Sequence, residues 1–265
     1  MPRDALIAYS GRSLARPFYY ANAHEKDQVE IAPAAMPVHD ARAIDAHVDR
    51  EGFQLVRHRS AITDWTDREA LAAVHRGEVA QLIKELTGAD EVHVNAPGIL
   101  RYSERSGKAG SSDNSHPARF AHIDINDTTA AKFAAGGAQG RAFRRCAAYN
   151  LWRALSPAPQ DVPLALCDAR SVADADLIVA EAIFDPPNGA PEWSFESWVV
   201  AHNPAHRWYF YPDLSAEEAI LFKTNDSDPE RAHCVPHVAF DDPTAPEDAP
   251  PRVSIEMRAT AYWWA

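Results

Sequence analysis

The sequence predicts a mainly β protein with flanking helices, arranged as a sandwich or a barrel-like jelly roll. Two observations favour this class. From residue 147 onward, short stretches rich in aromatic and β-branched residues recur, each bounded by Pro, Asp, Asn or Ser. The 20 prolines also cluster in short segments such as 243–251, which is typical of loops between strands and argues against a helical bundle. Many short strands joined in this way indicate a closed or double-sheet β architecture.

The length of 265 residues fits a single domain, because all-β cores of this size commonly stay undivided. We therefore expect one domain over residues 1–265. Residues 1–36 alternate aromatic and polar stretches without a clear period, which favours an N-terminal arm that lies across the main body. Short strands follow at 38–42 and 53–58, on either side of a polar turn.

The clearest helix in the sequence lies between Thr66 and Gly88. Thr66 and Glu69 have the spacing of a capping box, an apolar stripe continues to Leu86, and Gly88 is the expected stop. His75 is expected on the solvated side of this helix.

The other elements are strands, one long polar loop and a second helical stretch. Residues 103–117 are rich in Gly, Ser, Lys and Asn and form either a lid or a plain connection. Residues 127–145 have helical composition, interrupted at Gly136-Gly137. Strands are expected at 91–95, 98–102, 148–153, 164–167, 196–200, 206–211, 219–223 and 252–263.

The charge balance excludes two classes of partner. The chain has 26 Lys and Arg against 38 Asp and Glu, a formal net charge of -12, which repels phosphate backbones and anionic lipid surfaces. We therefore expect no nucleic acid and no membrane as partner. No apolar run approaches membrane-spanning length and the first residues do not open a signal peptide, which indicates a cytoplasmic protein. The odd number and wide spacing of the cysteines favour reduced thiols, at Cys146, Cys167 and Cys234.

The stretch around His122 carries the main indication of chemistry. A strand that holds His122 and Asp124 points both side chains to one face, because strand side chains alternate with period two. A second imidazole would complete two histidines and one carboxylate on one face of an iron ion, with the opposite face open for a cosubstrate and oxygen. This set of ligands is typical of oxygenases.

The His-x-Asp pattern alone is weak evidence, and the chain contains it twice. His47-Val48-Asp49 lies in a charged stretch without strand alternation and is expected at the surface. Candidates for the second imidazole are His202, His206, His233 and His237. His237 is preferred, because an apolar strand continues after it.

The last expected strand is charged along one face. By the period of two, that face carries Arg252, Ser254, Glu256 and Arg258. A bound dicarboxylate such as 2-oxoglutarate would balance this charge, because Arg252 can hold its far carboxylate with two hydrogen bonds and Ser254 can add a third. The candidate cofactor-binding residues are Arg252, Ser254 and Arg258. Alternatively, the polar face of this strand simply meets solvent.

Several segments together carry a family resemblance, at 49–53, 84–89, 150–153, 163–171, 203–209, 236–243 and 250–258. With them the chain resembles the cephalosporin 7α-methoxylase and fungal hydroxylase–desaturase family of iron(II)- and 2-oxoglutarate-dependent oxygenases, over most of its length from about residue 38. The resemblance implies a double-stranded β-helix, the cupin-like jelly roll. It also implies His122, Asp124 and His237 as iron ligands and Arg252 as the 2-oxoglutarate anchor. The implied cofactors are Fe(II), 2-oxoglutarate as cosubstrate, and O2.

This resemblance implies hydroxylation or desaturation of a C–H bond in a small molecule, in natural-product biosynthesis. Halogenation is disfavoured, because a halide would need the position that Asp124 occupies. Trp152 and Arg153 are the preferred candidates for the substrate pocket or for support of the ligands, in a set that comprises Asn150, Trp152, Arg153, His206, Arg207, Trp208 and Tyr209. Such aromatic residues on strands are also typical of core packing, and His206 of a structural hydrogen bond.

Two other functions stay open at this point. One is a cupin-like metal dioxygenase or isomerase that uses no 2-oxoglutarate. The other is a non-enzymatic β-sandwich module whose aromatic strands bind a ligand or partner. The sequence leaves open the natural substrate, the choice between hydroxylation and desaturation, and the oligomeric state, for which a homodimer is one option.

Overall fold

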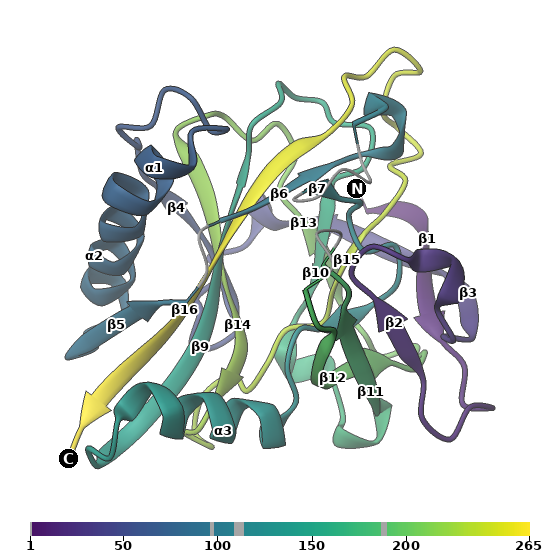
Figure 1. Ribbon diagram of the computed structural model, residues 1–265. Helices are drawn as coiled ribbons and strands as arrows, with labels where there is room; N and C mark the ends of the chain where they lie inside the picture. The colour runs from purple at the N-terminus through teal and green to yellow at the C-terminus, as the bar shows by residue number, and fades with distance from the viewer. Residues whose placement is uncertain (1, 96–97, 109–113, 187–189) are drawn as a thin grey trace.

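A computed structural model of the chain describes residues 2–95, 98–108, 114–186 and 190–265 (Figure 1). Within these ranges the strands form a nine-stranded and a seven-stranded sheet, which face each other across the interior. The predicted class, mainly β with flanking helices in a jelly roll, is confirmed. No helix among the described residues is long and apolar enough to cross a membrane.

The larger sheet lies at the right in Figure 1. From edge to edge it consists of β1 (Arg3–Ser10), β3 (Ile31–Asp40), β13 (Trp208–Phe210), β10 (Leu164–Cys167), β15 (His237–Ala239), β8 (His122–Ile123), β12 (Trp193–Val200), β11 (Leu177–Phe184) and β2 (Phe18–Tyr20). The segment predicted as an N-terminal arm therefore supplies strands at both edges, β1 at one and β2 at the other.

The smaller sheet is built around two long antiparallel strands, β9 and β16. Its strands are, in order, β4 (Phe53–Arg57), β14 (Glu218–Asp226), β9 (Phe143–Ala154), β16 (Val253–Trp264), β6 (Ile99–Tyr102) and β7 (Asn114–Ser115), with β5 (Glu91–Val94) also paired to β16. The β9–β16 ladder runs from Phe143 opposite Trp264 to Ala154 opposite Ser254. It spans the whole width of the site described below.

The first helical segment comprises α1 (Arg68–Ala70), a π-helical turn (Leu71–His75) and α2 (Arg76–Thr87). The predicted capping box at Thr66 is wrong by one residue, because the Asp67 side chain accepts the backbone N–H of Ala70 at 3.0 Å. Thr66 instead bonds to Asp64. Gly88 ends the helix as predicted, with a left-handed φ of 69°.

The expectation that His75 is solvated is also wrong. His75 is buried, and its Nδ1 lies 2.9 Å from a Glu78 carboxylate oxygen and 3.3 Å from the Ser60 hydroxyl. The spacing explains the difference, because His75 lies four residues after the buried Leu71 and four before the buried Val79 and therefore shares their face.

Helix α3 (Asp127–Ala138) crosses one end of the two sheets, at the bottom of Figure 1. Asn126 caps its first turn by accepting the N–H of Thr129 at 2.9 Å. The helix runs through Gly136-Gly137, so the expected interruption is wrong. A Cβ at Gly137 would lie 2.2 Å from the Tyr262 hydroxyl, and glycine therefore allows α3 to pack closely against β16.

Each sheet has one face toward the central core and one face covered from outside. The central core between the sheets includes Phe53, Trp152, Leu166, Ile220 and Phe222. Helix α2 covers the outer face of the smaller sheet with Val79 and Ile83. On the opposite face of the larger sheet, a separate cluster includes Ile7, Tyr9, Trp208 and Phe210. Which face a strand residue belongs to therefore decides whether it can reach the interior.

Candidate metal centre

His122 and His237 lie opposite each other on neighbouring strands of the larger sheet. The register pairs His237 of β15 with His122 of β8, and the two ring centroids are 4.3 Å apart. Asp124 follows two residues after His122, in a bend just beyond β8. One potential ligand atom from each of the three residues lies within 4.8 Å of the other two. The structure thus brings together residues that are far apart in the sequence, since 115 positions separate His122 from His237 (237 - 122).

Both imidazoles are oriented by the backbone. His122 Nδ1 lies 3.0 Å from the carbonyl oxygen of Phe120, and His237 Nδ1 lies 3.1 Å from that of Val235. A carbonyl oxygen only accepts, so each Nδ1 carries a hydrogen and donates it, which leaves each Nε2 facing Asp124. Both Nε2 atoms lie 3.8 Å from an oxygen of Asp124. This arrangement is the one that metal-binding histidines commonly adopt.

Asp124 is held at both of its oxygens. Arg258 donates from Nη2 to Oδ1 at 2.7 Å, and Asn150 donates from Nδ2 to Oδ2 at 2.6 Å. Arg258 is itself fixed by Glu256, which accepts from its Nε at 2.8 Å. Burial by itself raises the pKa of Asp124, but the positive charge of Arg258 opposes it and, with the hydrogen bond from Asn150, holds the pKa below its usual range. The carboxylate therefore stays charged and keeps one orientation.

The donor set fits a ferrous ion. Burial, followed by the neighbouring His237, lowers the pKa of His122 to about 3, so the imidazole is neutral and its Nε2 lone pair is available. Two imidazoles and one carboxylate on one side of a point are the ligands of non-haem iron sites. Aromatic rings enclose the histidines: Phe222 lies 4.8 Å from the His237 ring and Phe120 5.6 Å from the His122 ring.

Other candidate ligands lie away from this cluster. His206 is buried on the other face of the larger sheet, where Nδ1 is 3.1 Å from the Tyr9 hydroxyl and Nε2 is 3.2 Å from Asp176. The His233 Nε2 lies 2.8 Å from Asp127. Both histidines therefore have other partners.

The second His-x-Asp motif has a structural role. His47 is exposed, as expected, and Asp49 accepts from the buried Lys223 at 2.6 Å. Over the described ranges, the one group of three potential ligands that converges consists of His122, Asp124 and His237.

A small cavity borders this cluster on the side of β16. Its walls include both histidines and Asp124, together with Trp152, Leu164, Arg101, Arg252 and Glu256. Arg252 is buried, and its Nε and Nη1 donate to the Ser254 hydroxyl at 3.1 Å and to the Val162 carbonyl at 3.0 Å. The guanidinium carbon of Arg252 also lies 5.0 Å from the centre of a Trp152 ring. Its position is therefore fixed before any ligand enters.

Two arginines share this small cavity. Burial, followed by repulsion from Arg101, lowers the pKa of Arg252 to about 9. Burial also lowers the pKa of Arg101. Arg252 donates to two neutral groups, so an anion in this cavity would offset part of the cost of burying its guanidinium.

A much larger cavity, of about 890 Å³, borders the cluster on the side of α3. Its walls come mainly from α3, β9, β12, β14 and β16. Asp124 is the one residue that lines both this cavity and the smaller one. Asn150 and Arg258, which hold Asp124, line the larger cavity. Ligands in the two cavities would therefore meet at the candidate metal ligands.

The structure separates the predicted substrate residues into two groups. Asn150 and Trp152 face the interior from β9, Asn150 in the larger cavity and Trp152 in the smaller one. Arg153, the next residue, points to the opposite face and donates to the carbonyl of His58 at 2.9 Å. Arg153 and His206 therefore lie on outer faces and line neither cavity. Strand alternation is the physical reason.

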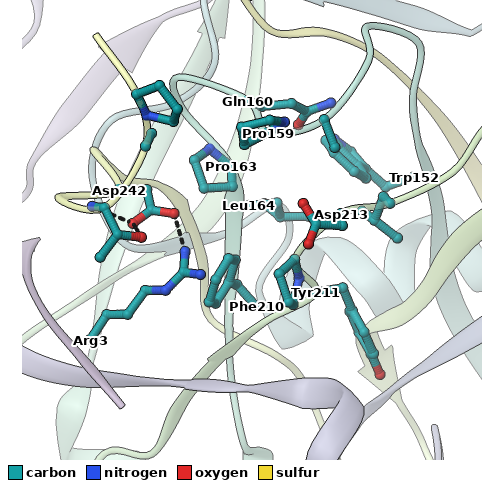
Figure 2. A pocket seen from close by; sticks show the side chains of 16 residues that line it. Arg3, Trp152, Pro159, Gln160, Pro163, Leu164, Phe210, Tyr211, Asp213 and Asp242 are labelled. Carbon is teal, nitrogen blue, oxygen red and sulfur yellow. Dashed lines mark hydrogen bonds and ion pairs between the residues drawn. The ribbon is translucent and has the colours of Figure 1, made fainter. Parts of the chain in front are cut away.

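Trp152 also borders a third hollow, of about 100 Å³, shown in Figure 2. Arg3 and Asp242 form an ion pair at one side of this hollow, and Pro159, Phe210 and Tyr211 contribute apolar surface. None of the three candidate metal ligands lines it. We therefore regard it as a surface depression behind the smaller cavity.

Three residues near the site were not chosen as site residues from the sequence, although Glu256 was placed on the charged face of the last strand. Arg101 and Glu256 line the smaller cavity, and the ring of Tyr19 on β2 lies 6.5 Å from that of His122. For Arg101 a signal existed in the sequence, since it is the one charged residue between Ile99 and Tyr102 in an expected strand. For Tyr19 no local signal existed, because its approach depends on β2 pairing with β11.

Comparison with known proteins places this arrangement in a wider group. A family model described as the oxidoreductase/YMDC permease-like domain matches residues 7–262. The alpha-ketoglutarate-dependent dioxygenase phiK of a fungal species is 32% identical over 239 residues, which cover 85% of this chain and 82% of phiK. The hydroxylase/desaturase efuI of Hormonema carpetanum is 31% identical over 247 residues, which cover 85% of this chain and 82% of efuI.

Among solved structures, the iron and alpha-ketoglutarate-dependent endoperoxidase NvfI has a similar fold. Its TM-score is 0.81 at 21% sequence identity, and the match covers 99% of this chain and 98% of that one. At this level of identity the likeness concerns the fold, and it supports the jelly-roll architecture.

Proposed function

We propose that the chain, which belongs to the hydroxylase/desaturase family of iron(II)- and 2-oxoglutarate-dependent dioxygenases, binds its iron between His122, Asp124 and His237. Its cofactors are those of the family: Fe(II), 2-oxoglutarate and O2. This membership sets aside both the cupin-like enzyme without 2-oxoglutarate and the non-enzymatic binding module. One observation carries the assignment of the ligands: two Nε2 atoms face one buried carboxylate, while each Nδ1 faces a backbone carbonyl.

The smaller cavity, of about 30 Å³, is the proposed site of the far carboxylate of 2-oxoglutarate. Arg252, held by Ser254 and Val162, would donate to the far carboxylate of the cosubstrate, while its keto acid end lies toward the histidines. Arg101 adds a second positive charge in the same cavity. Arg258 was predicted to bind the cofactor, but it contacts Asp124 and lines the other cavity. We therefore assign Arg258 to positioning the carboxylate.

The larger cavity is the proposed site of the substrate. When bound, the iron supplies the oxidising chemistry, with 2-oxoglutarate and oxygen as co-reactants. The protein places a C–H bond of the substrate beside Asp124, keeps the carboxylate in one orientation through Asn150 and Arg258, and excludes water with aromatic side chains. The names of the relatives lead us to propose hydroxylation or desaturation of a small molecule. The cytoplasmic location and the homodimer option stay predictions.

An anaerobic titration tests the ligand assignment. Wild-type protein is titrated with iron(II) in the presence of 2-oxoglutarate, and the metal-to-ligand absorption band and the iron content are measured. We expect Asp124→Ala and His237→Ala to lose both. The matched control is His47→Ala, which alters the other His-x-Asp motif and should behave as wild type. Retention of the band and of iron by Asp124→Ala and His237→Ala, with folding intact by circular dichroism, would refute the assignment.

A further inference from the structure

We propose that the larger cavity binds a neutral, largely apolar molecule of drug-like size, and that the small residues of α3, Gly136 in particular, set how bulky that molecule can be. This inference rests on the proposed function, because it requires the substrate to lie beside Asp124. It adds the chemical class of the substrate and a residue that determines specificity.

Volume is the first argument. About 890 Å³ lies at the upper end of the range for pockets that enclose drug-sized ligands. A substrate limited to a few heavy atoms would leave most of this apolar space filled with water, at a cost in affinity. The cavity is therefore suited to a bulky molecule rather than to a small metabolite.

The composition of the wall is the second argument. Aromatic rings line one part of it, with Phe133 of α3 5.4 Å from Phe195 of β12, and Trp193 5.6 Å from Phe195. Small apolar residues line another part, including Ala130, Ala134, Ala148 and Ala259. These surfaces favour an apolar ligand with rings or branches.

Charge pairing is the third argument. Asp226, in the wall, lies 2.6 Å from Arg145 and 2.5 Å from Lys223. Arg258 is paired with Asp124 at 2.7 Å, and Asp127 lies 2.8 Å from His233. Lys132 also lines the cavity, but it is exposed to solvent. A charged ligand inside the cavity would have to break one of the pairs, so a neutral ligand is favoured.

Gly136 connects the wall to specificity. A Cβ added at Gly136 would meet no atom within 4 Å, although the residue lines the cavity. The neighbouring Gly137 differs, because its Cβ would clash with Tyr262. A side chain at position 136 would therefore take up open space at the wall of the cavity, without disturbing the packing of α3 on β16.

A pair of dyes that differ by one charge tests the inference on the intact protein without iron. N-phenyl-1-naphthylamine is neutral and fluoresces in apolar surroundings, whereas 8-anilino-1-naphthalenesulfonate carries the same rings with an anionic group. We expect wild type to bind the neutral dye about tenfold more tightly, since Asp226, Arg258, Asp127 and His233 in the wall are already paired and Lys132 is solvated. We expect Gly136→Leu to weaken binding of the neutral dye about tenfold or more, because the leucine side chain overpacks the site.

Gly77→Leu is the matched control. Gly77 is also a helical glycine whose added Cβ meets nothing within 4 Å, but it lies in α2, away from the cavity. It should bind the neutral dye as wild type does. The inference is overturned if wild type does not bind the neutral dye, if it prefers the anionic one, or if Gly136→Leu binds as tightly as Gly77→Leu.

The iron titration separates this inference from the proposed function. Gly136→Leu should keep the absorption band with iron(II) and 2-oxoglutarate, because position 136 lines only the larger of the two cavities. Absence of the band in wild type would overturn the proposed function whatever the dyes show. A normal band together with unchanged dye binding by Gly136→Leu would overturn the cavity assignment and leave the proposed function standing.

Discussion

Replacing Arg252 by glutamine should separate cosubstrate binding from folding. The guanidinium of Arg252 is buried, and its contacts with Ser254 and Val162 hold it in the smaller cavity. The burial that lowers its pKa to about 9 costs roughly 4 to 5 kcal/mol. Its two hydrogen bonds, at about 1.5 to 3 kcal/mol each for a charged donor, offset a similar amount. Removing the guanidinium should therefore change the free energy of unfolding of the unliganded protein by less than about 2 kcal/mol.

The effect on 2-oxoglutarate should be much larger. Truncating one partner of a buried, hydrogen-bonded charge pair costs about 2 to 5 kcal/mol, and the nearby Arg101 should keep the loss in the lower half of that range. This corresponds to a dissociation constant raised by about 30-fold to 300-fold. Isothermal titration calorimetry with 2-oxoglutarate measures the affinity, and urea unfolding of the same sample measures the stability. Arg252→Lys keeps the charge without the two-pronged geometry and should give an intermediate affinity.

Arg153→Gln is the control for this experiment. Arg153 is also a buried arginine whose pKa is lowered by burial, but it lies on the outer face of β9. It should leave the affinity for 2-oxoglutarate unchanged. The assignment of Arg252 fails if Arg252→Gln binds 2-oxoglutarate as wild type does, or if Arg153→Gln loses affinity to the same extent.

Three further predictions concern stability. Lys223→Met should lower the free energy of unfolding by about 3 kcal/mol in urea titrations, because it leaves two aspartates that the buried ammonium contacts without that partner; an unchanged midpoint would contradict this. Arg42 lowers the pKa of Glu218 to about 2, so the ion pair stabilises the fold at neutral pH. This contribution is lost as the pH falls from the pKa of Glu218 in the unfolded chain toward 2. The difference in the free energy of unfolding between wild type and Glu218→Gln should therefore be present at pH 7 and close near pH 2. In thermal melts, Gly136→Ala should gain roughly 0.5 to 1 kcal/mol from helix propensity, whereas Gly137→Ala should lose about 1 to 3 kcal/mol by clashing with Tyr262; equal melting temperatures would refute the packing described for α3.

Local periodicity was enough to predict part of the site. The period of two places His122 with Asp124, and Arg252 with Ser254, and the structure has both pairs on shared faces. The choice of His237 needed more, because four histidines in the second half of the chain were candidates. Strand context favoured His237, and the cross-strand pairing with His122 is a long-range contact that no local pattern encodes.

The same alternation shows why Arg153 was misplaced. Trp152 and Arg153 are neighbours on β9, so only one of them can face the interior. The sequence does not identify the inner face, because Leu151 packs under α2 and is as apolar as the residues of the central core. The outward position of His206 has a similar cause, since the Tyr9 that it contacts comes from β1, nearly 200 residues earlier (206 - 9 = 197). Both misplacements follow from tertiary packing rather than from local preference.

The carboxylate of Asp124 lies between two cavities of unequal size and lines both of them. Asn150 and Arg258 hold this carboxylate by hydrogen bonds. A substitution at either residue would therefore move a proposed metal ligand that both cavities share. The residues of α3 line only the larger cavity. Related chains can therefore diversify along α3 to accept new molecules while the reaction centre is inherited intact, and an engineer who wishes to redirect the enzyme should begin with that helix.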